Sequence, residues 1–218
     1  MGEHTETGAR IAIVLYEGMT LLDAIGPYEV LRLMPGASVR FVAREVGPIV
    51  ADSGVLALSA THTFDELPDP DILLVPGSTA DTMTAMADEA LISWIKTAHE
   101  TSRFTTSVCT GALVLAAAGL LKGHEATTHW AAQRFLPRFG ATARSGARTV
   151  RSGKIWTAAG VSAGIDLGLA IVGAMCGQDE AELAQLFIEY DPQPPFDSGH
   201  MSKARPEIAR EAKARMVR

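Results

Sequence analysis

Short apolar runs alternate along the chain with segments in which apolar residues recur at helical spacing. A short continuous apolar run is typical of a strand buried on both faces of a sheet. The runs expected to form strands are residues 10–16, 39–43, 72–75, 104–108, 149–151 and 155–158, with two more pieces within 50–59. The segments expected to form helices are residues 27–33, 88–100, 110–121, 163–175, 179–189 and 206–217.

Local signals place some of the boundaries. Pro27 is the expected first residue of the first helix, because a proline at that position has no N–H to leave unpaired. Ser152-Gly153 lies between two strand runs and is typical of a two-residue hairpin turn. The alternation of strands and helices predicts an α/β fold, with a mostly parallel central sheet and helices on both faces.

The composition is that of an ordinary globular protein, with 218 residues, 47% of them hydrophobic and 20% charged. There is no internal repeat, low-complexity tract or interdomain linker, so we expect a single domain over residues 1–218. Residues 1–9 are expected to be a flexible N-terminus, and a C-terminal helix is expected within 200–218. The Pro-rich stretch 190–199 is either a surface connection or a stiff loop that packs against something, such as a second subunit.

Charge and composition also exclude several classes of protein. The net charge of −6 and the absence of a long basic stretch argue against nucleic acid as the main partner. No apolar run reaches the length of a membrane span. The polar first ten residues do not resemble a signal peptide, so a cytoplasmic protein is expected. Two distant cysteines, Cys109 and Cys176, form neither a disulfide framework nor a zinc site.

Cys109 lies where a strand run ends and a helical run begins. This placement resembles a nucleophile elbow, a tight strand-to-helix turn that exposes a reactive side chain. The N–H groups and dipole at the start of a helix favour a thiolate there. The alternative is that Cys109 is a small buried apolar residue. Cys176 follows an apolar helical run without an elbow, and packing explains it best.

Candidate anion-binding and acid/base residues follow two other predicted strands. Successive N–H groups of the Gly77-Ser78 turn could form an anion-binding nest, although a simple turn is the alternative. Asp23 is the only charge in the apolar stretch 21–27, where it is either a capping residue or a general acid/base facing the thiol. His129 is either the partner of an activated cysteine or a capping or core histidine beside Trp130.

Five segments together resemble the DJ-1/PfpI superfamily and, within it, the isonitrile (isocyanide) hydratase group. The segments are residues 22–27, 75–77, 107–111, 126–130 and 163–166, and the resemblance covers about residues 10–200. The superfamily implies a flavodoxin-like three-layer sandwich, usually a homodimer, with the cysteine at the elbow. It implies neither a metal nor an organic cofactor.

Departures from the superfamily pattern favour the hydratase group. The protease-like members have a histidine directly after the cysteine, and here that residue is Thr110. DJ-1 itself has a glutamate near the thiol, whereas this chain and the hydratase group have an aspartate, Asp23. A second glycine often follows the Pro-Gly turn, and Ser78 replaces it.

The resemblance implies a covalent hydration of an isonitrile to an N-formamide. Cys109 would attack the terminal carbon of the isonitrile and Asp23 would supply the proton, which gives a thioimidate. Water guided by Asp23 would then release the product. The catalytic residues are thus expected to be Cys109, Asp23 and Thr110. Substrate or oxyanion binding is expected from Gly77, Ser78 and His129. A DJ-1-type glyoxalase or stress protein and a ligand- or redox-sensing domain are the alternatives.

Overall fold

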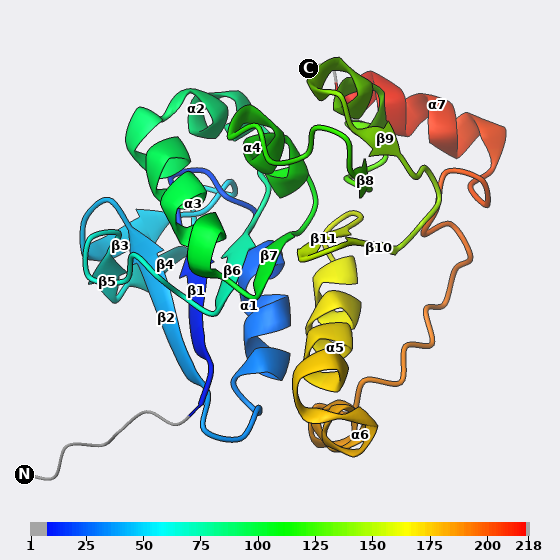
Figure 1. Ribbon diagram of the computed structural model, residues 1–218. Helices are drawn as coiled ribbons and strands as arrows, with labels where there is room; N and C mark the ends of the chain where they lie inside the picture. The colour runs from blue at the N-terminus through cyan, green and yellow to red at the C-terminus, as the bar shows by residue number, and fades with distance from the viewer. Residues whose placement is uncertain (1–7, 217–218) are drawn as a thin grey trace, which may run out of the picture.

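A seven-stranded sheet forms the centre of the molecule in the computed structural model, which describes residues 8–216 (Figure 1). The strand order is β10-β11-β7-β6-β1-β2-β5, and all neighbouring pairs are parallel except β10 with β11. These strands are β1 (Arg10–Val14), β2 (Ser38–Ala43), β5 (His62–Thr63), β6 (Ile72–Val75), β7 (Phe104–Ser107), β10 (Thr149–Ser152) and β11 (Ile155–Ala158). The predicted α/β fold with a mostly parallel sheet is confirmed.

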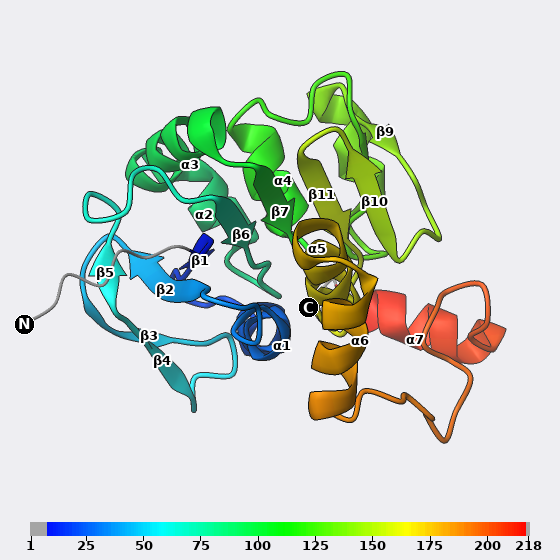
Figure 2. The same cartoon turned by 60° about the horizontal axis from the view of Figure 1, so that its bottom comes forward.

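Helices cover both faces of this sheet (Figure 2). Helices α2 (Thr82–Ala87), α3 (Glu89–Thr101) and α4 (Gly111–Ala117) lie on one face, and α1 (Leu21–Leu31) and α5 (Ala163–Cys176) pack together on the other. Along each strand, successive side chains point to opposite faces of the sheet. In β1, Ala12 and Val14 pack into the first layer, whereas Ile11 and Ile13 pack into the second.

Smaller elements complete the chain. Two short sheets lie beside the main one, formed by β3 (Gly47–Val50) with β4 (Ala57–Ala60) and by β8 (Glu125–Ala126) with β9 (Thr142–Ala143). A 3₁₀ helix, η1 (Gln133–Phe139), joins β8 to β9. Helices α6 (Gln178–Phe187) and α7 (Pro206–Arg215) end the chain. The sequence pattern predicts the β3–β4 hairpin and misses α2, β5, β8, β9 and η1.

The prediction that the first helix begins at Pro27 is wrong, because α1 begins at Leu21 and Pro27 is its seventh residue. The missing N–H of Pro27 removes a single helical hydrogen bond, and packing compensates for this loss. Pro27 and the neighbouring Gly26 are buried against α5, where their small size allows the two helices to approach closely. The longer helix has a functional consequence, since Asp23 lies in its first turn.

The C-terminal region is an arm on the outside of the molecule. Residues 191–200 are exposed, and α7 has no buried residue (Figures 1 and 2). At the start of the arm, the Tyr190 hydroxyl and the Arg148 guanidinium both donate hydrogen bonds to Asp166 on α5. Residues 191–199 run along the surface of this chain, and their packing against a second subunit stays a prediction; the predicted terminal helix exists from Pro206.

Some sequence predictions concern features that the structure leaves open. Residues 1–7, most of the expected flexible N-terminus, lie outside the described residues, and the single domain and the homodimer stay predictions. Ala9 already pairs with β2, because its carbonyl accepts a hydrogen bond from the Ser38 N–H. No helix within residues 8–216 is long and apolar enough to cross a membrane.

Candidate active site

Cys109 lies in the turn between β7 and α4, at the carboxyl edge of the sheet. Its φ of 57° is in the left-handed region, which costs a residue other than glycine roughly 1–2 kcal/mol. Hydrogen bonds hold this strained conformation in place: the Cys109 N–H donates to Ala159 O at 3.0 Å, and the Thr128 hydroxyl donates to Cys109 O at 2.7 Å. The predicted elbow is therefore present.

Asp23 approaches the same thiol from α1. The Gly77 N–H donates to its Oδ2 at 2.9 Å, and its Oδ1 is buried without a hydrogen-bond partner in the described chain. The Cys109 thiol lies against the carboxyl and interacts with it. The structure thus brings the predicted acid and the predicted nucleophile together, although they are far apart in sequence.

Burial controls the protonation of both groups. It raises the pKa of Asp23 from 3.8 to about 7, against the opposing effects of the Gly77 N–H and the Cys109 thiol. Burial, with the charge of Asp23, raises the pKa of Cys109 to about 12, although the N–H groups of Val161 and Thr110 oppose this shift. The pair therefore keeps one proton between these two pKa values. Burial and the charge of Asp23 therefore oppose the thiolate that the N–H groups at the start of α4 favour.

The shared proton predicts how Cys109 reacts with iodoacetamide. The rate should rise about tenfold per pH unit up to about pH 7, where the pair loses its first proton, and then level off. In Asp23→Asn the inflection near pH 7 should disappear. Peptide mapping by mass spectrometry at a series of pH values measures the rate, with exposed Cys176 as the internal reference. A rate independent of pH from 5 to 8 would contradict the shared proton.

Gly77 and Ser78 are close to the thiol, but they do not offer the predicted anion-binding nest. The Gly77 N–H donates to Asp23, and the Ser78 N–H donates to the Thr110 hydroxyl at 2.9 Å. Both donors are therefore already paired within the protein. The turn instead fixes the position of Asp23 and ties β6 to the start of α4.

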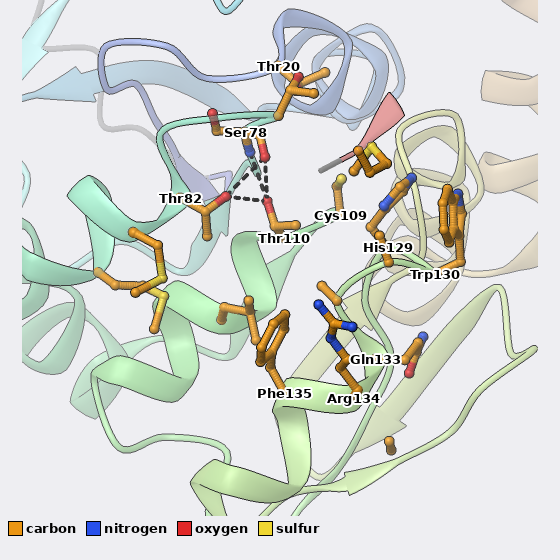
Figure 3. A pocket seen from close by; sticks show the side chains of 18 of the residues that line it. Thr20, Ser78, Thr82, Cys109, Thr110, His129, Trp130, Gln133, Arg134 and Phe135 are labelled. Atoms are coloured by element: carbon orange, nitrogen blue, oxygen red, sulfur yellow. Dashed lines mark hydrogen bonds between the residues drawn. The ribbon is translucent and has the colours of Figure 1, made fainter. Parts of the chain in front are cut away.

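Thr110 also has a different environment from the expected one. Its hydroxyl accepts the Ser78 N–H and lies 2.7 Å from the Thr82 hydroxyl (Figure 3). These contacts hold the hydroxyl in a half-buried hydrogen-bond network with Ser78 and Thr82. Its backbone N–H, in contrast, interacts with the Cys109 thiol, and so does that of Val161. Sequence analysis missed Val161, because it contributes only a backbone group from a loop that the fold brings to the site.

The turn at Gly77 leaves no space for a side chain. A Cβ there would lie 2.5 Å from Thr110 N and from its Oγ1, and 3.0 Å from Asp23 Oδ2. We expect Gly77→Ala to separate the turn from α4, to lower activity about 100-fold or more and to lower stability by about 2–4 kcal/mol. Enzyme kinetics and denaturant unfolding measure the two effects.

Gly173→Ala in α5 is the matched control, because its added Cβ would be 3.6 Å from Ala181 Cβ, an ordinary contact. An alanine within a helix is expected to preserve or raise stability. Full activity in Gly77→Ala would show that catalysis does not need the close approach between the Gly77 turn and Thr110 at the start of α4.

His129 reaches the site from the loop after β8. Burial lowers its pKa, so the ring is neutral at pH 7. The ring packs against the Gly160 backbone and stacks with Trp130 at a centroid distance of 5.1 Å. Among the described residues it makes no side-chain hydrogen bond, so the interpretation as the base of a Cys/His pair has no geometric support. Its nitrogens remain available to a ligand.

A cavity of about 1150 Å³ opens in front of Cys109. Cys109, Thr110, Ser78 and His129 form its inner end, as Figure 3 shows. Apolar side chains form most of its walls: Met83, Met86, Leu113, Trp130, Phe135 and Phe139. Lys213 and Met216 reach it from the C-terminal arm. No three histidine, cysteine, aspartate or glutamate side chains within residues 8–216 are placed to hold a metal ion.

Comparison with known proteins identifies the family of the chain. The DJ-1/PfpI family matches residues 9–174. The chain belongs to the DJ-1/PfpI family. It is 41% identical over 206 residues to isonitrile hydratase of Pseudomonas putida, an alignment that covers 94% of this chain and 89% of the relative.

Solved structures of the family show the same architecture. A ThiJ/PfpI family protein from Pseudomonas syringae superimposes with a TM-score of 0.93 and is 37% identical, with coverage of 100% of this chain and 91% of that one. Drosophila melanogaster DJ-1beta has a TM-score of 0.77 at 14% identity, over 84% of this chain and 98% of that one. The flavodoxin-like fold implied by the sequence resemblance is confirmed.

Proposed function

We propose that this protein hydrates isonitriles to N-formamides, with Cys109 as the nucleophile and Asp23 as the group that moves protons. The observation that carries the proposal is the buried Cys109–Asp23 pair, in which Cys109 lines the inner end of an apolar cavity and the pKa of the carboxyl behind it is about 7. A group that alternates between acid and base needs a pKa near the working pH. The 41% identity to an isonitrile hydratase supports the choice of substrate.

The first half of the reaction forms a bond between sulfur and carbon. As Cys109 Sγ attacks the terminal carbon of R–N≡C, the thiol proton passes to Asp23. Asp23 then gives this proton to the same carbon, and the product is the thioimidate R–N=CH–S–Cys109. Oδ1 of Asp23 suits this transfer, because no N–H or O–H group of the described chain donates a hydrogen bond to it.

The second half adds water and restores the thiol. Asp23 removes a proton from water as the oxygen bonds to the thioimidate carbon, and it passes this same proton to the nitrogen. The resulting R–NH–CH(OH)–S–Cys109 then collapses, the carbon–sulfur bond breaks, and the hydroxyl proton returns to the sulfur. The N–H groups of Thr110 and Val161 stabilise the negative charge that develops on sulfur, and the neutral His129 ring is placed to hydrogen-bond the substrate.

The net change is R–N≡C plus water to R–NH–CHO, without oxidation or reduction. Each step uses only water and groups of the chain itself. We therefore expect activity without a metal or organic cofactor. Dialysis against EDTA is expected to leave the rate unchanged.

A direct assay tests the function. The purified protein is incubated with 4-nitrophenyl isonitrile in ¹⁸O-labelled water, and the product is identified by liquid chromatography and mass spectrometry. We expect the formamide with one ¹⁸O atom in its formyl group. If several isonitriles yield no formamide while methylglyoxal is converted to lactate, the glyoxalase alternative replaces this proposal.

A further inference from the structure

The cavity is much larger than the group that reacts. An isonitrile function has only two heavy atoms, whereas the cavity of about 1150 Å³ is as large as sites that hold whole drug-sized ligands. The walls beyond the inner end therefore contact the remainder of the substrate. Met83, Leu113 and Phe135 belong to these walls and suit an apolar or aromatic body.

The charges that line the cavity have one sign. Arg134 and Arg138 from η1 and Lys213 from α7 line it, and no aspartate or glutamate within residues 8–216 does. This distribution is opposite to that of the whole chain, which has a net charge of −6. A cavity lined by positive charge attracts anions and raises their local concentration.

The two arginines also stack on the same aromatic ring, and neither has a counter-ion in the described chain. Their guanidinium carbons lie 4.9 and 5.1 Å from the centroid of the same ring, that of Phe135. Neither makes a salt bridge with a carboxylate of the described chain, unlike the nearby Arg144 and Arg148. The Arg134 side chain extends from η1 into the cavity, toward the end that holds Cys109 and His129 (Figure 3).

From this arrangement we infer that the substrate carries a carboxylate beyond an apolar or aromatic body, at the end opposite its isonitrile group. The guanidinium group is planar and binds a carboxylate through two parallel hydrogen bonds, which a neutral substituent cannot form. A bound anion would also supply the counter-charge that these two arginines lack in the described chain. The inference rests on the proposed function and specifies its substrate class as isocyano-carboxylates.

The kinetic test compares 4-isocyanobenzoate with its neutral methyl ester. We expect kcat/KM for the acid to exceed that for the ester about tenfold in the wild type, mainly through a lower KM. The double variant Arg134→Gln/Arg138→Gln is expected to bring this ratio close to one. Arg151→Gln is the matched control, because Arg151 also stacks on an aromatic ring, that of Trp156, but lies outside the cavity.

A binding test is independent of turnover. Calorimetry compares 4-formamidobenzoate with its methyl ester, and we expect the acid to bind about tenfold more tightly, a preference that the double variant loses. If no isonitrile is hydrated, the proposed function fails, and this binding ratio alone decides the inference. If the esters are hydrated or bound as well as the acids, or if the preference survives in the double variant, the inference is overturned while hydration stands.

Discussion

Cys109→Ala is expected to abolish formamide production, with a loss of at least about 10³-fold in kcat. No other described side chain at the inner end of the cavity carries a thiol, and the hydroxyl groups of Ser78 and Thr110 are engaged in hydrogen bonds. Without the sulfur, Asp23 has no bonded intermediate to protonate. Steady-state turnover of an aryl isonitrile measures the effect.

Cys176→Ala is the matched control for this variant. Its thiol is exposed at the end of α5, so full activity is expected. Circular dichroism and thermal unfolding should show that Cys109→Ala stays folded, since alanine is slightly smaller, and its N–H and carbonyl can make the same backbone hydrogen bonds. Appreciable turnover in a folded Cys109→Ala protein would contradict covalent catalysis.

Asp23→Asn is expected to lower kcat about 10²- to 10⁴-fold, because an amide can neither take the thiol proton nor return it. The amide oxygen can still accept the Gly77 N–H, so the turn is expected to keep its place. In the wild type, kcat/KM should rise with pH up to about 7, as the Cys109–Asp23 pair loses its first proton. The residual activity of Asp23→Asn should not show this rise of kcat/KM between acidic pH and pH 7.

The same carboxyl predicts a dependence of stability on pH. Its pKa is 3.8 when it is free in solution and about 7 in the folded protein, so the folded state binds the proton more tightly between these values. The free energy of unfolding should therefore fall as pH rises from about 4 to 7, by on the order of a few kcal/mol. Denaturant unfolding at several pH values measures this loss, which Asp23→Asn should lack.

Asp65→Asn, which removes an exposed carboxyl, is the control and should keep the pH dependence of the wild type. Two results would contradict the role of Asp23. One is a folded Asp23→Asn protein with wild-type kcat, and the other is a wild type whose stability increases from pH 4 to 7.

Much of the fold follows from local sequence. The apolar runs that become β1, β6 and β11 are continuous because helices bury both faces of the sheet. The start of α1 could not be predicted this way, because contact with α5 compensates for a proline within the helix. The short elements β8, β9 and η1 were missed because they are too brief for a periodic pattern.

Some residues of the candidate site can likewise be predicted from local sequence, whereas others cannot. Cys109 was evident from the strand-to-helix junction, and Asp23 from its isolation in an apolar stretch, since both signals are local. The arginines of η1 gave no signal, because a surface helix normally carries such residues. Only the fold shows that Arg134 and Arg138 face the cavity that contains Cys109.

Local patterns in the sequence are enough to indicate the class of fold, the family resemblance and the two residues that carry the proposed chemistry. The protonation of these two residues follows only from the packed fold, because burial depends on how α1, β6 and α4 meet at the carboxyl edge of the sheet. The packed fold also pairs the Gly77 and Ser78 N–H groups within the protein. The sequence shows which N–H groups exist but not which acceptor each one binds. That acceptor is determined by how the chain packs in three dimensions.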